Sequence, residues 1–95
     1  MNEETILTRH PEGKKGVNIL RRRYEITRAA LLEVLREHGE LGPMDLYEKT
    51  AARLDGRLDG KPLWYAVTVK LDLEARGELT TTRRKGGQLV SIHRS

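Results

Sequence analysis

The stretch from residue 61 to residue 93 constrains the fold of this chain more than any other part of it. It begins with apolar residues at helical spacing, reaches a glycine at Gly77, and ends in two runs rich in Thr and Val around a basic turn. Glycine suits the position just past a helix end, and Thr and Val favour strands. The stretch therefore predicts a helix at residues 62–77, strands at residues 79–83 and 88–92, and a turn at residues 84–87.

Two further helices are expected upstream. Apolar residues recur at helical spacing over residues 21–38, and Gly39 fits the position just past that helix. A second helix is expected over residues 43–54 with Gly42 as its cap, because Pro43 suits a first helical position, where its missing amide hydrogen costs nothing. Residues 40–42 are too few for a helix and favour a brief strand that pairs with the C-terminal hairpin.

Two segments show no clear period. Residues 1–20 contain turn-forming Pro and Gly, followed by an apolar patch of Val17, Ile19 and Leu20. We expect this segment to be an extended arm that packs in its second half. The other segment joins the second and third helices through two Asp-Gly pairs, and Leu58 between them is expected to enter the core.

This order of elements predicts an α+β fold of the winged helix-turn-helix class, with a three-helix bundle and a C-terminal β-hairpin wing. Residues 1–20 would form an N-terminal arm and residues 21–95 the winged-helix domain. A chain of 95 residues suits one domain with a modest core. A helix followed by a basic hairpin most often docks on nucleic acid.

Composition excludes several classes of protein. The chain has no cysteine, which excludes a disulfide framework and a thiolate metal site. No apolar run approaches the ~20 residues of a membrane span, and the acidic N-terminus lacks the apolar centre of a secretion signal. We therefore expect a cytoplasmic protein that binds no membrane and needs no cofactor.

The charge is concentrated at the two ends of the chain. The formal net charge is +4, from 18 Lys and Arg against 14 Asp and Glu. Residues 1–23 and 77–95 each carry +3, whereas residues 24–76 carry −2. Basic ends around a near-neutral centre suit a protein that contacts the phosphate backbone, although solvated chain ends would give the same pattern.

The predicted third helix is apolar on both faces, although a helix that reads base edges has a polar outer face. Asp72 at the rim of the outer face is expected to repel phosphate, and Lys70 is expected to pair with Glu74 one turn on. Three arrangements would explain the apolar outer face. The arm folds over it, a second copy of the chain covers it in a homodimer, or DNA meets mainly the wing and arm. The faces carry Ala66, Val69 and Leu73 on one side and Trp64, Val67, Leu71 and Ala75 on the other.

The candidate nucleic-acid-binding residues lie in the wing, in the arm and at the starts of the first and third helices. The wing turn carries three adjacent cations beside glycines, which let a backbone approach closely. Three arginines open the first helix, where cations oppose the helix dipole. The structural alternatives are a solvated hairpin tip and arginine stems that cover apolar surface. The candidates are Arg83, Arg84, Lys85, Lys61, Thr68, Lys14, Lys15, Arg21 and Arg22, with Tyr65 as a further donor beside Lys61 and Thr68.

No arrangement of residues predicts catalysis. His10, His38 and His93 lie far apart in the sequence, outside any metal-ligand spacing. Asp72 and Glu74 are two residues apart on a helix, so their carboxylates point to different sides and cannot act as a pair. We therefore expect no enzyme activity.

The runs WYAVTVKLDLEARGEL and HPEGKKGVNI resemble a family of small uncharacterised bacterial proteins. Trp64 and residues 71–77 carry this resemblance, which covers most of the chain and implies a winged-helix-like fold but no activity. Residues 73–77, LEARG, are also similar to the end of the recognition helix in marR-like transcription regulators. The chain departs from those regulators in its long turn before Pro62 and in its apolar outer face.

We therefore expect a small winged-helix protein that binds double-stranded DNA, with transcriptional regulation as its setting. The wing and arm would hold the phosphate backbone, and few bases would be read directly. The alternative is a winged-helix module that dimerises or binds another protein through its third helix, without binding nucleic acid. In that case Trp64, Val67 and Leu71 would form the interface.

Overall fold

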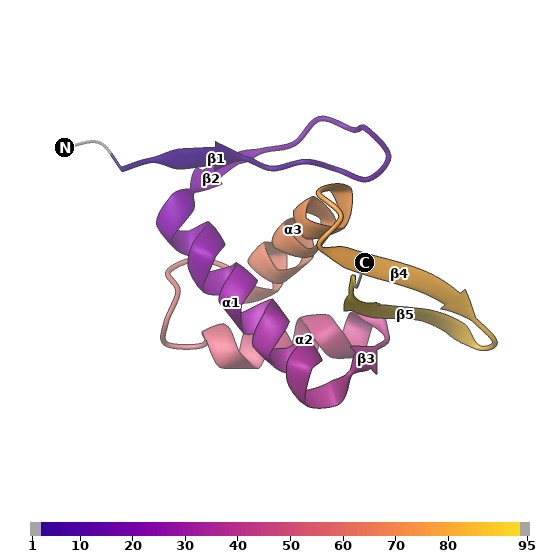
Figure 1. Cartoon of the computed structure of the whole chain (residues 1–95). Coiled ribbons are helices and arrows are strands. Elements are labelled where there is room, and N and C mark those ends of the chain that lie inside the picture. The colour runs from indigo at the N-terminus through magenta and orange to yellow at the C-terminus, as the bar shows by residue number, and fades with distance from the viewer. Residues whose placement is uncertain (1–2, 94–95) are drawn as a thin grey trace.

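The computed structural model describes residues 3–93 of the chain. Within these residues the fold is α+β, with three helices and two small antiparallel sheets (Figure 1). The elements in chain order are β1 (Thr5–Leu7), β2 (Asn18–Leu20), α1 (Arg21–His38), β3 (Glu40–Leu41), α2 (Pro43–Leu54), α3 (Pro62–Ala75), β4 (Leu79–Arg84) and β5 (Gly87–Ile92).

The three helices pack around one apolar core. Positions that helical spacing places on the inner face of α1 are buried, Leu31 and Leu35 among them. The predicted inner face of α3 is fully buried as well, since Ala66, Val69 and Leu73 are each 0% exposed. Burying one Leu or Val side chain completely stabilises a fold by about 1.5–3 kcal/mol, so these positions hold the bundle together.

Helices α1 and α3 are each followed by the glycine that the sequence indicated. Gly39 and Gly77 both have a φ of 82°. After α3, the amide of Gly77 donates to the carbonyl of Glu74 at 3.1 Å, and the amide of Glu78 donates to the carbonyl of Leu73 at 2.8 Å. These bonds satisfy carbonyls that a helix end leaves without partners. α3 therefore ends two residues before the predicted position, because the next two residues form this cap.

The C-terminal hairpin of β4 and β5 (residues 79–92, the wing) extends away from the helices (Figure 1). Its strands pair from Leu79 with Ile92 to Arg84 with Gly87, so each is one residue longer at the turn than predicted. β3 pairs with β5 as predicted, which gives a sheet of order β3-β5-β4. This arrangement is compatible with a winged-helix-like layout.

Two local predictions are confirmed, one in the connection between α2 and α3 and the other within α3. Leu58, between the two Asp-Gly pairs, is buried in the core. Lys70 is 5% exposed, and its Nζ lies 3.2 Å from Glu74 Oε2, so the predicted pair forms. Glu74 also accepts a hydrogen bond from the hydroxyl of Thr81, which joins α3 to β4.

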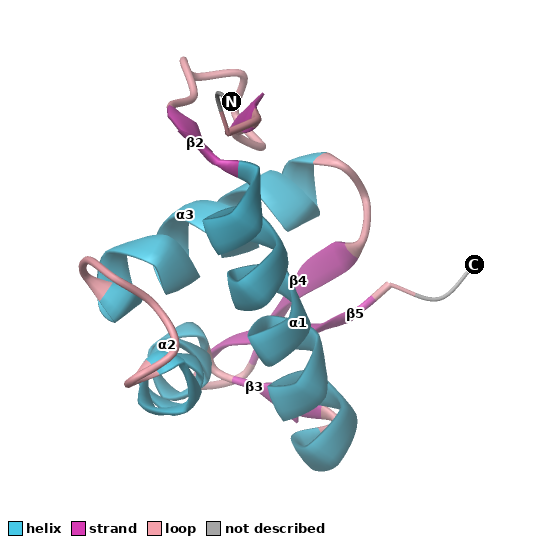
Figure 2. Ribbon diagram, turned by 90° about the vertical axis from the view of Figure 1, so that its left-hand side faces the viewer, coloured by secondary structure: helices cyan, strands magenta, loops and turns pink. Residues whose placement is uncertain are grey.

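The arm (residues 3–20) is a β-hairpin, so its second half packs as predicted and its first half, which was expected to be extended, packs as well. β1 pairs with β2 in antiparallel register, and Thr8, just past β1, exchanges three hydrogen bonds with Val17. Thr8 and Ile19 are buried. Strands of three residues are too short to show the alternation that indicates a strand in a sequence. In two views the arm lies on the opposite side of the helices from α2 (Figures 1 and 2).

Asp72 is buried, which corrects the prediction that it would lie exposed at the rim of α3. Its carboxylate is 0% exposed and accepts the amide of Arg9 at 2.8 Å and the hydroxyl of Tyr24 at 2.5 Å. Arg76 Nε donates to both of its oxygens, at 2.8 and 2.9 Å, and Arg76 Nη2 also reaches the carbonyl of Leu7 at 3.4 Å. Donors from the arm, α1 and α3 therefore meet at one carboxylate, which offsets the cost of its burial.

Replacement of Tyr24 by Phe tests this cluster through its pH dependence. Burial, and then the hydrogen bond to Asp72, raise the pKa of Tyr24 above its usual range. Between the usual tyrosine pKa of about 10 and this raised value, the unfolded chain releases the Tyr24 proton and the folded chain keeps it. The contribution of Tyr24 to stability is therefore complete below about pH 10 and declines as the pH rises further.

In urea unfolding near neutral pH, the wild type should be more stable than Tyr24→Phe by about 1–3 kcal/mol. This difference should narrow at higher pH, because only the wild type loses the contribution of Tyr24. A constant difference between the two proteins across the alkaline range would contradict the assignment.

Candidate nucleic-acid interface

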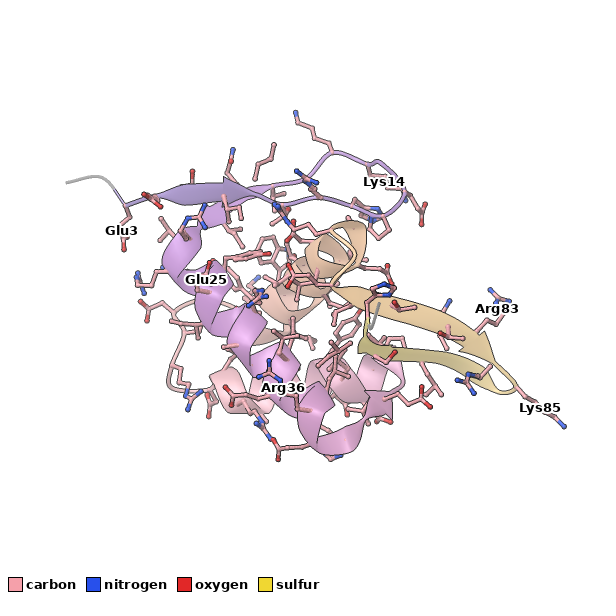
Figure 3. All side chains as sticks on the ribbon, viewed as in Figure 1. Glu3, Lys14, Glu25, Arg36, Arg83 and Lys85 are labelled. Carbon is pink, nitrogen blue, oxygen red and sulfur yellow. The ribbon has the colours of Figure 1, made fainter. Side chains whose placement is uncertain are left out.

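The tip of the wing presents three exposed cations, Arg83, Arg84 and Lys85. Figure 3 shows Arg83 and Lys85 projecting away from the body of the molecule. Among the described residues, neither of these two has an ion-pair partner, and Arg84 Nη2 lies 3.9 Å from Glu40 Oε2. An exposed pair at that distance contributes little, so all three cations remain able to contact phosphate.

A second group of cations lies in the loop between β1 and β2 (residues 8–17, the arm loop). Lys14 Nζ is 3.5 Å from Glu12 Oε1, and both side chains are about two-thirds exposed. Arg9 and Lys15 are exposed and form no ion pair with any described residue. Figure 3 shows Lys14 on the side of the molecule from which the wing projects.

The arginines that open α1 are paired within the molecule. Arg21 Nε lies 3.0 Å from Glu4 Oε2, and Arg22 Nε lies 3.0 Å from Glu3 Oε1. The carboxylates of the arm thus offset the unfavourable position of these cations at a helix N-terminus. A phosphate at Arg21 or Arg22 would have to compete with them, so these two candidates are weaker than the cations of the wing.

The candidates at the start of α3 have different environments. Lys61 is exposed and has no ion-pair partner among the described residues. Tyr65 is only 8% exposed, and its hydroxyl accepts a hydrogen bond from Arg23 Nη1 at 3.0 Å. Because its side chain packs in the core, Tyr65 is a weaker candidate donor to a phosphate than the exposed Lys61. Thr68 is half-buried and lies beside Trp64 and Leu71.

The arm loop lies against the outer face of α3 and forms an open crevice of about 170 Å³ with it. Leu71 and Val67 on this face are half-buried, whereas Trp64 remains 44% exposed. Of the three arrangements that the sequence allows, the structure therefore has the one in which the arm folds over α3. The arm nevertheless leaves much of the Trp64 indole accessible. The crevice is lined by Thr8, Arg9, His10, Lys15, Gly16, Val17, Trp64, Thr68 and Leu71.

A wider hollow of about 670 Å³ lies between the end of α1 and the three-stranded sheet. Arg36, Glu40 and His93 contribute its charged and titratable side chains, and His93 Nδ1 is 3.0 Å from the hydroxyl of Thr80. The carboxylate of Glu40 beside Arg36 makes this hollow less suited to a phosphate than the wing tip.

Two further properties concern residues 3–93 only. Their His, Asp and Glu side chains form no group of three that could hold a metal ion. Of the helices in this range, none has the length and apolar composition needed to cross a membrane.

Sequence reasoning missed Arg9 and His10 as members of the site. Both lie in the segment of turn-forming residues before Lys14 and Lys15. In the sequence, only the basic residue next to a histidine could have indicated a site there. It was not decisive, because only the hairpin brings Arg9 and Lys15, six residues apart, to the same crevice.

Replacement of Gly16 by Ala tests whether the arm covers α3 in solution. A Cβ at Gly16 would lie 1.7 Å from the carbonyl oxygen of Thr8, so the two halves of the arm loop would have to separate. We expect a loss of about 1–3 kcal/mol in stability and an increase in acrylamide quenching of Trp64. Gly42→Ala is the matched control, since its Cβ would lie 3.7 Å from the nearest atom, the carbonyl oxygen of Gln88. Equal quenching in both variants would show that the arm does not shield Trp64.

Comparison with known proteins gives one match. No match was found among curated proteins or among solved structures, and no relationship to the marR-like regulators was found. The model of a family described as a family of unknown function, DUF6958, matches residues 5–89, which include most of the arm, the three helices and most of the wing. The chain therefore belongs to this family, in agreement with the uncharacterised family expected from its sequence.

Proposed function

We propose that this chain is a winged-helix protein that binds double-stranded DNA through the phosphate backbone, with the wing as the main contact. The order α1-β3-α2-α3-β4-β5 and the sheet order β3-β5-β4 support the winged-helix assignment. In such folds, the third helix and the wing are the elements that approach nucleic acid. Transcriptional regulation is the setting in which this activity is expected.

The observation that carries the proposal is the exposed tip of the wing. Arg83 and Lys85 project into solvent without ion-pair partners among the described residues, whereas Arg21 and Arg22 are paired with carboxylates of the arm. Unpaired cations on a projecting hairpin reach phosphates without first breaking other contacts. Release of counterions from those phosphates would then favour binding.

The position of the arm supports backbone contact over base readout. Base edges in the major groove are read by polar side chains of a helix that enters the groove. Here Thr68 and Leu71 on the outer face of α3 lie behind the arm loop. With the arm in this position, α3 cannot enter a groove along its length. The binding is therefore expected to depend strongly on salt and only weakly on sequence, as phosphate contacts do.

A second candidate function is a winged-helix module that dimerises or binds another protein. The exposure of apolar side chains near the starts of α2 and α3 favours it, since Met44 is 63%, Leu63 49% and Trp64 44% exposed. Leu63 and Trp64 are adjacent in the sequence, and apolar patches on a surface often mark protein interfaces. This function predicts that Leu63→Asp changes the mass in solution and that variants of the wing do not.

The DNA-binding proposal is tested by removing the three cations of the wing tip together. The variant Arg83→Ala, Arg84→Ala, Lys85→Ala should lose most of its affinity for a mixed-sequence duplex. If each cation meets one phosphate, the log–log salt slope should become about 2–3 units less steep. The measurement is fluorescence anisotropy of a labelled duplex at several salt concentrations, with circular dichroism to verify folding.

The matched control removes three other exposed cations, as Arg36→Ala, Lys49→Ala, Arg57→Ala. None of the three forms an ion pair with a described residue, so the control lowers the net charge equally and spares the wing. Its duplex affinity should stay close to that of the wild type. An equal loss in both variants would mean that net charge alone drives binding. Absence of binding by the wild type at low salt would overturn the proposal.

A further inference from the structure

The crevice between the arm loop and α3 has an aromatic wall that is held in place. The Trp64 ring packs edge-to-face against Tyr65, with ring centroids 5.0 Å apart and an interplanar angle of 87°. Tyr65 is itself fixed, because it is buried and its hydroxyl accepts a hydrogen bond from Arg23. Trp64 thus combines a fixed ring with substantial exposure, which are the properties of a stacking platform for a flat ligand.

The size of the crevice selects a ligand of about one ring. Its volume is about 170 Å³, and a protein cavity of about 150 Å³ holds one benzene-sized molecule. A duplex is far too wide to enter such a space, but one heterocyclic base is of a suitable size. Leu71 and Val17 supply further apolar surface beside Trp64.

The charges on the crevice select an anionic ligand. Arg9, Lys15 and His10 line it, and no lining residue carries a carboxylate. Asp72 accepts the backbone amide of Arg9, which fixes the position of this residue while its exposed guanidinium stays without an ion-pair partner among the described residues. His10 Nδ1 accepts the amide of Glu12 at 3.1 Å, so a neutral ring has its proton on Nε2 as a further donor.

We propose that this crevice binds a single unpaired nucleotide, with its base stacked on Trp64 and its phosphate held by Arg9 and Lys15. The proposal deepens the proposed function, on which it rests, by adding a site for one unpaired nucleotide to a wing that contacts duplex backbone. The same chemistry is offered by a free mononucleotide and by an unpaired nucleotide within a strand. The base of a nucleotide would stack on the Trp64 ring while its phosphate pairs with the cations, so one ligand would use both features of the crevice.

Because Trp64 is the only tryptophan of the chain, its fluorescence reports this site directly. The probes are a short oligodeoxythymidylate, thymidine monophosphate, a fully paired duplex and inorganic phosphate. We expect the oligodeoxythymidylate to quench the fluorescence of Trp64. The fully paired duplex should bind to the wing and leave the fluorescence of Trp64 unchanged. Quenching by thymidine monophosphate at similar concentrations would identify the free nucleotide as the ligand. Inorganic phosphate should leave the emission of Trp64 unchanged, and equal quenching by phosphate would overturn the role of the base.

Variants separate the two halves of the site. The double variant Arg9→Gln, Lys15→Gln should lower the affinity measured by Trp64 quenching about tenfold or more, since two contacts to the phosphate are lost. Trp64→Ala should weaken binding of a labelled oligodeoxythymidylate, measured by anisotropy, by about fivefold or more. Trp64→Phe keeps an aromatic ring, so its affinity for the oligodeoxythymidylate should lie between those of the wild type and Trp64→Ala. This variant keeps the test valid if Trp64→Ala does not fold.

The outcomes distinguish this inference from the proposed function. The wing variant is expected to lose duplex binding while the oligodeoxythymidylate still quenches its Trp64. This result would support both the proposed function and the crevice site. Duplex binding without any quenching by the single strand or the mononucleotide overturns the crevice site alone. Trp64 emission that changes with protein concentration alone, with a doubled mass in sedimentation, would show that a second copy occupies this face, and would overturn it as well.

Discussion

The carboxylate of Asp72 is the point on which the arrangement of the arm depends. A buried carboxylate is costly unless donors surround it, and removal of one partner from a buried pair costs about 3–5 kcal/mol. Its donors come from the arm through Arg9, from α1 through Tyr24 and from α3 through Arg76. Because these elements must stay together to keep the charge satisfied, the arm loop is held against α3. The crevice and the partial exposure of Trp64 follow from that position.

The same constraint divides the basic residues of the chain into two groups. The arm that Asp72 fixes also brings Glu3 and Glu4 to the start of α1, where they pair with Arg22 and Arg21. The cations of the wing and of the arm loop remain largely unpaired among the described residues, because few carboxylates lie near them. Two clusters of similar composition therefore differ in their capacity for phosphate. This difference is the basis of the proposal that the wing would make the main contact with DNA.

Covering α3 also changes what a fold of this layout offers to nucleic acid. Polar residues on an exposed third helix would favour sequence readout, but here the outer face is apolar and faces the arm loop. The apolar face supplies one wall of the crevice, and Arg9 and Lys15 supply charge on the other. The proposed nucleotide site uses this face, which is unsuited to reading a groove. Backbone contact at the wing and capture of an unpaired nucleotide are compatible, because they use separate surfaces.

The sequence by itself determined the features that depend on neighbours along the chain. Helical spacing gave the limits of α1 and the inner face of α3, the glycines at positions 39 and 77 gave the helix ends, and Lys70 and Glu74 paired across one turn. Only the tertiary structure decided the arm hairpin, the burial of Asp72 and the core position of Tyr65. These depend on partners far away in the sequence, such as the Arg9 amide that reaches Asp72 across 63 residues. Spacing along a chain reports which side chains share a face, but folding decides what covers that face and which charges find partners.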